Sequence, residues 1–134
     1  MSDLKEKANQ IRQTIIKMAC RSKSPHTGSA LSCVDILAVL YNKILRLSDW
    51  NNRDFFILSK AQAAMALYST LHHQNIIDKN TIDSYFLDGG SLPGHLDKFT
   101  APGIEVSAGS LGHGFNIGLG LAYAHKKRKT DRKV

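Results

Sequence analysis

Apolar residues recur every three or four positions along residues 3–21, and charged residues occupy the other faces of this period. The spacing predicts an amphipathic helix. The pattern breaks over residues 22–28, where proline and glycine flank a histidine, so we expect a loop. A second helical pattern begins at Ser32, which stands three residues before Asp35 as in a capping box, and it ends near Leu47.

The middle of the chain changes its pattern. Residues 55–58 are a short apolar run, which predicts a fully buried strand. Residues 61–73 are rich in alanine, leucine and methionine and predict a helix. A short helix capped by Asn80 is expected next. Residues 87–111 show no periodic pattern and carry many glycines and prolines, so they predict a long loop. Loops of this length are usually either functional or disordered.

The last predicted helix covers residues 111–129 and has four glycines in its first half. Glycine inside a helix costs roughly 1 kcal/mol relative to alanine. Repeated glycine therefore indicates that this helix packs closely against another backbone or a ligand.

The order of these elements predicts an α/β fold, helix-rich and incomplete as a doubly wound sheet. Only one strand is convincing, and the sequence ends after a helix, where a βαβ pattern places another strand. With 134 residues, the chain has the length of one domain, and its elements are expected to be unfinished as an α/β domain.

Composition narrows the class of protein. A hydrophobic fraction of 43% is enough for a packed core, and no apolar run is long enough to cross a bilayer. The first residues are charged, unlike a secretory signal. Cys20 and Cys33 form no disulfide or zinc pattern. We therefore expect a cytoplasmic protein.

The net charge of +7 suggests a nucleic-acid hypothesis, but the charge is concentrated at one end. Residues 126–134 carry six basic side chains and one acidic one. Such a basic end suits either a nucleic-acid-binding tail or the C-terminus of a solvated helix, where cations oppose the helix dipole. No aromatic residue is interleaved with these charges to stack on bases, so the helix interpretation is favoured.

Two histidines stand in loops that contain glycine and proline: His26 in Ser-Pro-His-Thr-Gly and His95 in Leu-Pro-Gly-His-Leu. Histidine in such loops can approach a ligand and exchange protons, although one alone is more often an ordinary surface residue. The matching contexts favour a functional pair. No zinc site is expected among these residues, because adjacent His72 and His73 would project to different sides of a helix and no paired cysteines occur.

Residues 109–114, Gly-Ser-Leu-Gly-His-Gly, open the last predicted helix. Bare backbone amides at a helix N-terminus favour an anion such as phosphate. The turn is not a P-loop, because no Gly-Lys-Ser/Thr follows, and it does not have the glycine that a serine-nucleophile elbow requires. Packing remains the other explanation of these glycines.

Taken in order, these segments resemble the beginning of the transketolase family. The resemblance covers nearly the whole chain and rests on five motifs in register, each weak alone. They are Ser24-Pro25-His26-Thr27-Gly28, Val34 to Tyr41, Arg53 to Ala63, Leu92-Pro93-Gly94-His95-Leu96, and Pro102 to Gly114.

The resemblance implies transfer of a two-carbon ketol unit between sugar or sugar phosphate substrates, with thiamine diphosphate and Mg²⁺ as cofactors. By this resemblance His26 and His95 are catalytic and hydrogen-bond substrate oxygens. Gly109, Ser110 and Leu111 would approach the cofactor through their backbone.

Three departures from the family pattern affect these expectations. Gln62 stands where the family has a histidine that reaches the cofactor, and glutamine can donate a hydrogen bond but cannot titrate. The Gly-Asp-Gly metal motif would follow Val134 and is absent, as is the family's pyrimidine-binding domain. We therefore expect a complementary transketolase subunit or self-association. The alternatives are a non-catalytic remnant or interaction module, which Gln62 favours, and a nucleic-acid-binding module, which only the basic end favours.

Overall fold

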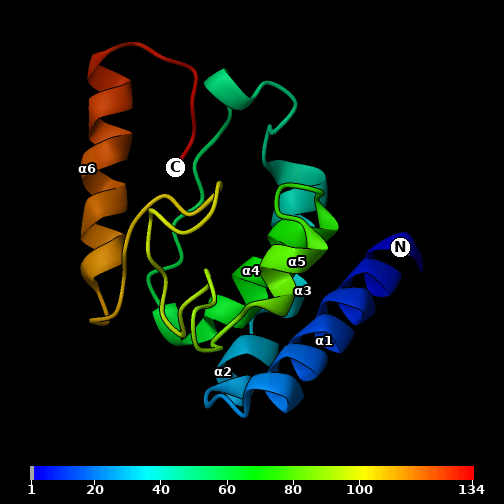
Figure 1. The fold of residues 1–134 in the computed structure, drawn as a ribbon. Helices are drawn as coiled ribbons and strands as arrows, with labels where there is room; N and C mark the ends of the chain where they lie inside the picture. The colour runs from blue at the N-terminus through cyan, green and yellow to red at the C-terminus, as the bar shows by residue number, and fades with distance from the viewer. Residues whose placement is uncertain (1) are drawn as a thin grey trace.

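The computed structural model describes residues 2–134, which form short and medium helices joined by long connections (Figure 1). Six α-helices are accompanied by a π-helix (η1) and two 3-10 helices (η2 and η3) in this part of the chain. Their bounds are α1 Ser2–Ser22, α2 Thr27–Leu31, α3 Val34–Val39, η1 Leu40–Ile44, η2 Trp50–Asn52, η3 Ala61–Ala63, α4 Ala64–His73, α5 Lys79–Asp83 and α6 His113–Lys127.

The predicted N-terminal amphipathic helix is confirmed as α1. Its apolar face is buried at Ala8, Ile11, Ile15 and Met18 and packs against α3 and α4. The charged residues on the opposite faces remain in solvent. No helix among residues 2–134 combines the length and apolar character needed to span a membrane.

Helix α4 is the centre of the molecule. Every residue from Ala64 to Leu71 is buried, and α4 contacts α1, α2, α3 and α5. The predicted helix over residues 61–73 is confirmed, with η3 as its first turn. Loops that bond to α4 are therefore held by the most rigid part of the structure.

Three details of the predicted helices are wrong. The second helix ends at the π-turn η1, where the Leu45 amide donates to the Leu40 carbonyl at 2.9 Å. Ser32 forms no capping box, because its hydroxyl donates to the Ser29 carbonyl instead. Asp78, not Asn80, caps α5 by accepting the Thr81 amide at 2.7 Å.

The predicted strand at residues 55–58 is not formed as a strand, and residues 2–134 contain none. These side chains are half-buried rather than fully buried. A strand is defined by a ladder, and this segment makes one backbone pairing, from the Phe55 amide to the Lys133 carbonyl at 2.8 Å. The expectation of an incomplete doubly wound α/β sheet is therefore not confirmed; the regular secondary structure of residues 2–134 consists of helices joined by long connections.

Helix α6 stands apart from the other helices and faces them across the segment of residues 53–60 (Figure 1). A side chain at Gly114 would place its Cβ 2.7 Å from Ser59 Cα and 3.1 Å from Ile57 Cγ2. The predicted close backbone packing is confirmed at this glycine. At Gly120, by contrast, a Cβ would meet nothing within 4 Å.

Candidate functional site

The loop that carries His26 is anchored to α4. Ser24 is buried, and its hydroxyl lies 3.7 Å from the sulfur of Met65. His26 adopts a left-handed conformation with φ 74° at the N-terminus of α2, and its carbonyl accepts the Ala30 amide at 3.0 Å. A non-glycine residue with positive φ is uncommon and is held there by its surroundings. The loop therefore holds the backbone of His26 in a defined conformation and leaves the ring exposed.

The loop that carries His95 is anchored to the same helix by Tyr68. The Tyr68 hydroxyl donates to the carbonyl of Pro93 at 3.1 Å and lies 3.4 Å from that of His95. Burial, and then the nearby Tyr85, raise the pKa of Tyr68 well above its usual range. The hydroxyl therefore keeps its proton and remains a donor to the loop.

The two histidine rings meet at the surface, although the residues are far apart in the sequence. Their centroids are 5.8 Å apart and their planes stand at 89°, an edge-to-face contact. Both residues are exposed. Two imidazole side chains thus share one solvent-facing position, where a polar ligand can reach both.

The turn of Gly109, Ser110 and Leu111 adjoins the His95 loop through backbone bonds. The Ala108 amide donates to the Leu96 carbonyl at 3.0 Å, and the Lys98 amide donates to Ser107 Oγ at 3.0 Å. Ser110 and Leu111 are exposed. No hydrogen bond among residues 2–134 joins the turn to the side chains of His26 or His95.

Gln62 lies in η3, which contacts the short helix α2 that His26 opens. Lys60 fixes this contact, because its ammonium donates to the Ser29 carbonyl at 3.1 Å and to Ser32 Oγ at 2.9 Å. The Oε1 atom of Gln62 is buried and has no hydrogen-bond partner. An unpaired buried polar atom is costly, which makes this amide a candidate ligand contact.

The donor set fits part of thiamine diphosphate. The orphaned Gln62 amide can accept from the amino group of the cofactor, or donate to a phosphate after a flip of its end groups. The residues present do not fit a bound Mg²⁺. That ion needs several oxygen ligands, and residues 2–134 bring no three His, Cys, Asp or Glu side chains together.

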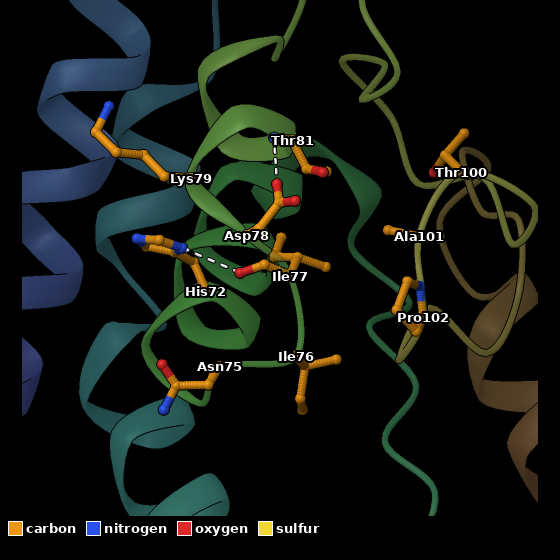
Figure 2. Close-up of a pocket in the computed structure, with 10 residues that line it drawn as sticks. All are labelled: His72, Asn75, Ile76, Ile77, Asp78, Lys79, Thr81, Thr100, Ala101 and Pro102. Carbon is orange, nitrogen blue, oxygen red and sulfur yellow. Dashed lines mark hydrogen bonds between the residues drawn. The ribbon is translucent and has the colours of Figure 1, made fainter.

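A cavity of about 550 Å³ lies elsewhere, between the α4–α5 connection and residues 100–102 (Figure 2). Its polar groups are used for local structure. His72 Nδ1 is 3.1 Å from the Ile77 carbonyl, and Asp78 caps α5. None of the residues predicted for the site lines this cavity, so it offers no alternative ligand set.

Lys60 and Tyr68 were not predicted from the sequence as parts of the site. Lys60 lies inside the motif Arg53 to Ala63, and the sequence marks it by a charge soon after an apolar run. Tyr68 gives no signal, because a tyrosine inside a helix-forming segment is typical of a core residue.

Replacing Tyr68 with phenylalanine is expected to loosen the His95 loop. The change removes the hydroxyl donor to two loop carbonyls, and we expect a loss of about 1–2 kcal/mol of unfolding free energy. Hydrogen exchange should become faster at the amides of Gly94 to Leu96. Tyr41→Phe is the control, because Tyr41 is also buried but lies outside this loop; equal acceleration in both variants would contradict the role of the hydroxyl.

Comparison with known proteins is consistent with this arrangement. The family model described as "Transketolase, thiamine diphosphate binding domain" matches residues 4–133. The chain is 36% identical over 129 residues to an apulose-4-phosphate transketolase subunit of Phocaeicola vulgatus, a match covering 92% of this chain and 45% of the relative. It is also 36% identical over 137 residues to the protein of the same name in Actinobacillus succinogenes, covering 98% and 50%.

The fold has a matching solved structure. Transketolase from Campylobacter jejuni superposes with a TM-score of 0.86 at 31% identity, covering 96% of this chain and 21% of that one. The chain spans about half the length of the two apulose-4-phosphate transketolase relatives that it matches. On the family match and these likenesses, this chain belongs to the transketolase family, within its thiamine-diphosphate-binding domain.

Proposed function

We propose that the chain is the N-terminal portion of the cofactor-binding domain of a thiamine-diphosphate-dependent enzyme. The enzyme transfers a two-carbon ketol unit between sugar or sugar phosphate substrates. It works in the cytoplasm, which the free thiols of Cys20 and Cys33 favour. The reaction type follows the family; the substrate class is suggested by the name of the relatives, apulose-4-phosphate transketolase.

The observation that carries the proposal is the edge-to-face contact of His26 and His95 at 5.8 Å. Each ring belongs to a family motif, and each motif loop is anchored separately on α4. In this role the two imidazoles hydrogen-bond the oxygens of the sugar and move a proton to or from the reacting hydroxyl. When bound, the cofactor would supply a nucleophilic carbon and a cationic ring that acts as an electron sink for the electron pair of the carbon–carbon bond.

Gln62 and the turn of Gly109 to Leu111 are proposed as the cofactor contacts. The support for Gln62 is its buried, unpaired amide oxygen. The support for the turn is its position before α6, whose N-cap residue Gly112 has φ 91° and makes no side-chain cap hydrogen bond. Uncapped amides at that end of a helix attract the negative charge of a phosphate.

The enzyme needs a further polypeptide, which we propose to be a complementary transketolase subunit rather than nucleic acid or membrane. The relatives are named as subunits, and the chain covers about half of each. The residues that would hold a Mg²⁺ ion would come from that polypeptide, since residues 2–134 bring no three His, Cys, Asp or Glu side chains together. A second candidate is a non-catalytic interaction module, which the replacement at Gln62 favours.

Calorimetry with thiamine diphosphate and MgCl₂ tests the proposal. The chain alone is expected to bind the cofactor weakly or not at all, because it supplies part of the contacts. Adding the remainder of the Phocaeicola vulgatus relative, with the polypeptide that complements it, should produce cofactor binding and ketol transfer. Micromolar affinity for the chain alone would contradict the shared site, and absence of transfer in the full mixture would favour the interaction module.

A further inference from the structure

A pocket of about 140 Å³ lies where α1, α4 and α5 meet. Its floor is apolar, because Met18 of α1 and Ile82 of α5 are buried. The other side chains that line it are polar or charged. They are Thr14, Lys17 and Arg21 from α1, His72 from α4, and Lys79 and Asp83 from α5. None of these residues belongs to the site proposed above for the substrate and the cofactor.

Positive charges outnumber negative charges in this pocket. Lys17, Arg21 and Lys79 bring three cations, and Asp83 brings one carboxylate. Asp83 accepts from Arg21 at 2.6 Å and also pairs with Lys79, so it holds both cations toward the same place. Lys17 forms no ion pair within residues 2–134. Three cations against one carboxylate leave the pocket with a net charge of +2.

His72 adds a ring nitrogen that has no partner. Its Nδ1 lies 3.1 Å from the Ile77 carbonyl, and Nδ1 carries a proton because a carbonyl can only accept. The other nitrogen, Nε2, makes no hydrogen bond within the described residues, and Figure 2 shows it pointing away from Ile77. Nε2 can donate to an anionic oxygen when the ring is protonated and can accept from a protonated oxygen when the ring is neutral.

We propose that this pocket binds a phosphate group, carried by a small ester or free as the inorganic ion. A phosphate monoester has a charge of about −1.5 to −2 at neutral pH, which matches the excess positive charge of the pocket. The Arg21 guanidinium and the two lysine ammonium groups are usual donors to phosphate oxygens. The site goes beyond the proposed function, because it needs neither the histidine pair nor the thiamine cofactor.

A solvated group of surface cations is the alternative explanation. Cations beside the end of α4 would oppose its dipole without any ligand. The arrangement of the side chains favours an anion instead. Lys17 and Arg21 stand four residues apart on α1, a spacing at which like charges repel, and Lys79 joins them from α5. An anion between the three cations relieves this repulsion, and the concave shape of the pocket gives it a defined position.

Titration of the full chain followed by NMR tests the proposal. The probes are inorganic phosphate and, separately, glycerol phosphate, with the ionic strength held constant by NaCl. Both probes should give saturable shifts at the His72 ring and at the amides of Lys17 and Lys79. Lys17→Met should weaken binding by about fivefold or more, because one charged donor is lost. Lys17 is exposed, so the fold should be unchanged.

Lys5→Met is the matched control. Lys5 is also exposed, lies on the same helix and forms no ion pair within residues 2–134, but it does not line the pocket. The control should change the affinity less than about twofold, because an exposed charge at a distance is screened. Tighter binding of glycerol phosphate would assign the site to a phosphate ester, and equal affinities would assign it to the free ion. Shifts that do not saturate, or equal weakening by both variants, would overturn the proposal.

Discussion

Replacing Asp54 with asparagine is expected to cost about 2–3 kcal/mol of unfolding free energy. The Asp54 side chain is completely buried and pairs with the Arg46 guanidinium at 2.7 Å. It also accepts the backbone amides of Arg46 at 3.0 Å and Lys133 at 2.9 Å. Asparagine keeps the shape but loses the charge and at least one acceptor. The tail should therefore detach from residues 46–54 as well.

The same carboxylate predicts a pH dependence. The bond from Arg46 is the main cause that holds the pKa of Asp54 far below its ordinary value of 3.8, and the two backbone amides add to it. A lowered pKa in the folded state means that the stabilisation is complete above the ordinary pKa and is lost as the pH falls below it. The wild-type protein should lose stability on acidification, and Asp54→Asn should lose less.

Urea unfolding at pH 7 and at about pH 3, below the ordinary pKa of aspartate, measures both effects. Asp35→Asn is the matched control, because Asp35 also pairs with an arginine, Arg12 at 2.5 Å, but is 75% exposed. An exposed pair contributes little, so this variant should lie within about 0.5 kcal/mol of wild type. Equal losses in the two variants would show that burial of Asp54 does not matter.

Replacing His95 with alanine in the reconstituted enzyme is expected to lower kcat by about 10²-fold or more. The same loss is expected for His26→Ala, because the two rings contact each other and act on one substrate. The double variant should lose much less than the product of the two single losses, since residues in one network are not additive. Both rings are exposed, so the fold should be unchanged.

The assay follows ketol transfer in the mixture of chain and complementary polypeptides. His125→Ala is the control, because His125 lies in the last turn of α6, outside the ring pair and the proposed cofactor contacts. A matching fall in His125→Ala would point to a general electrostatic effect. Full activity in His95→Ala would remove His95 from the proposed mechanism.

Helix α1 and helix α4 were predictable because their patterns are local. The apolar face of α1 repeats with the helical period, and the residues of α4 are good helix formers, so short-range preference and burial agree. The strand at residues 55–58 failed for the opposite reason. The apolar run indicates that the segment is buried, but it does not indicate which segment pairs with it. A β-ladder needs a second segment, and here the backbone of residues 55–58 bonds only to the carbonyl of Lys133.

For the histidine pair, the two residues were predictable from the sequence, but their contact was not. The contexts of His26 and His95 singled them out in the sequence, because loops with glycine and proline can present a side chain to a ligand. Their contact could not be predicted from either loop. The contact depends on two residues of α4 that hold the two loops. Met65 contacts Ser24 in the His26 loop, and the Tyr68 hydroxyl donates to the Pro93 carbonyl in the His95 loop.

The sequence by itself determined helices α1 and α4, the family resemblance and the candidate residues, since periodicity and motif order can be read from the sequence alone. Only the tertiary structure decided that the His26 and His95 rings meet, that Gln62 keeps a buried unpaired oxygen, and that cations of α1 and α5 line one pocket. The physical reason is that these features arise from packing between distant segments. Packing of this kind depends on which segments contact each other in the folded chain. Among the described residues, the segment 55–58 makes one backbone hydrogen bond, from Phe55 to Lys133, and α6 contributes no residue to the hydrophobic core.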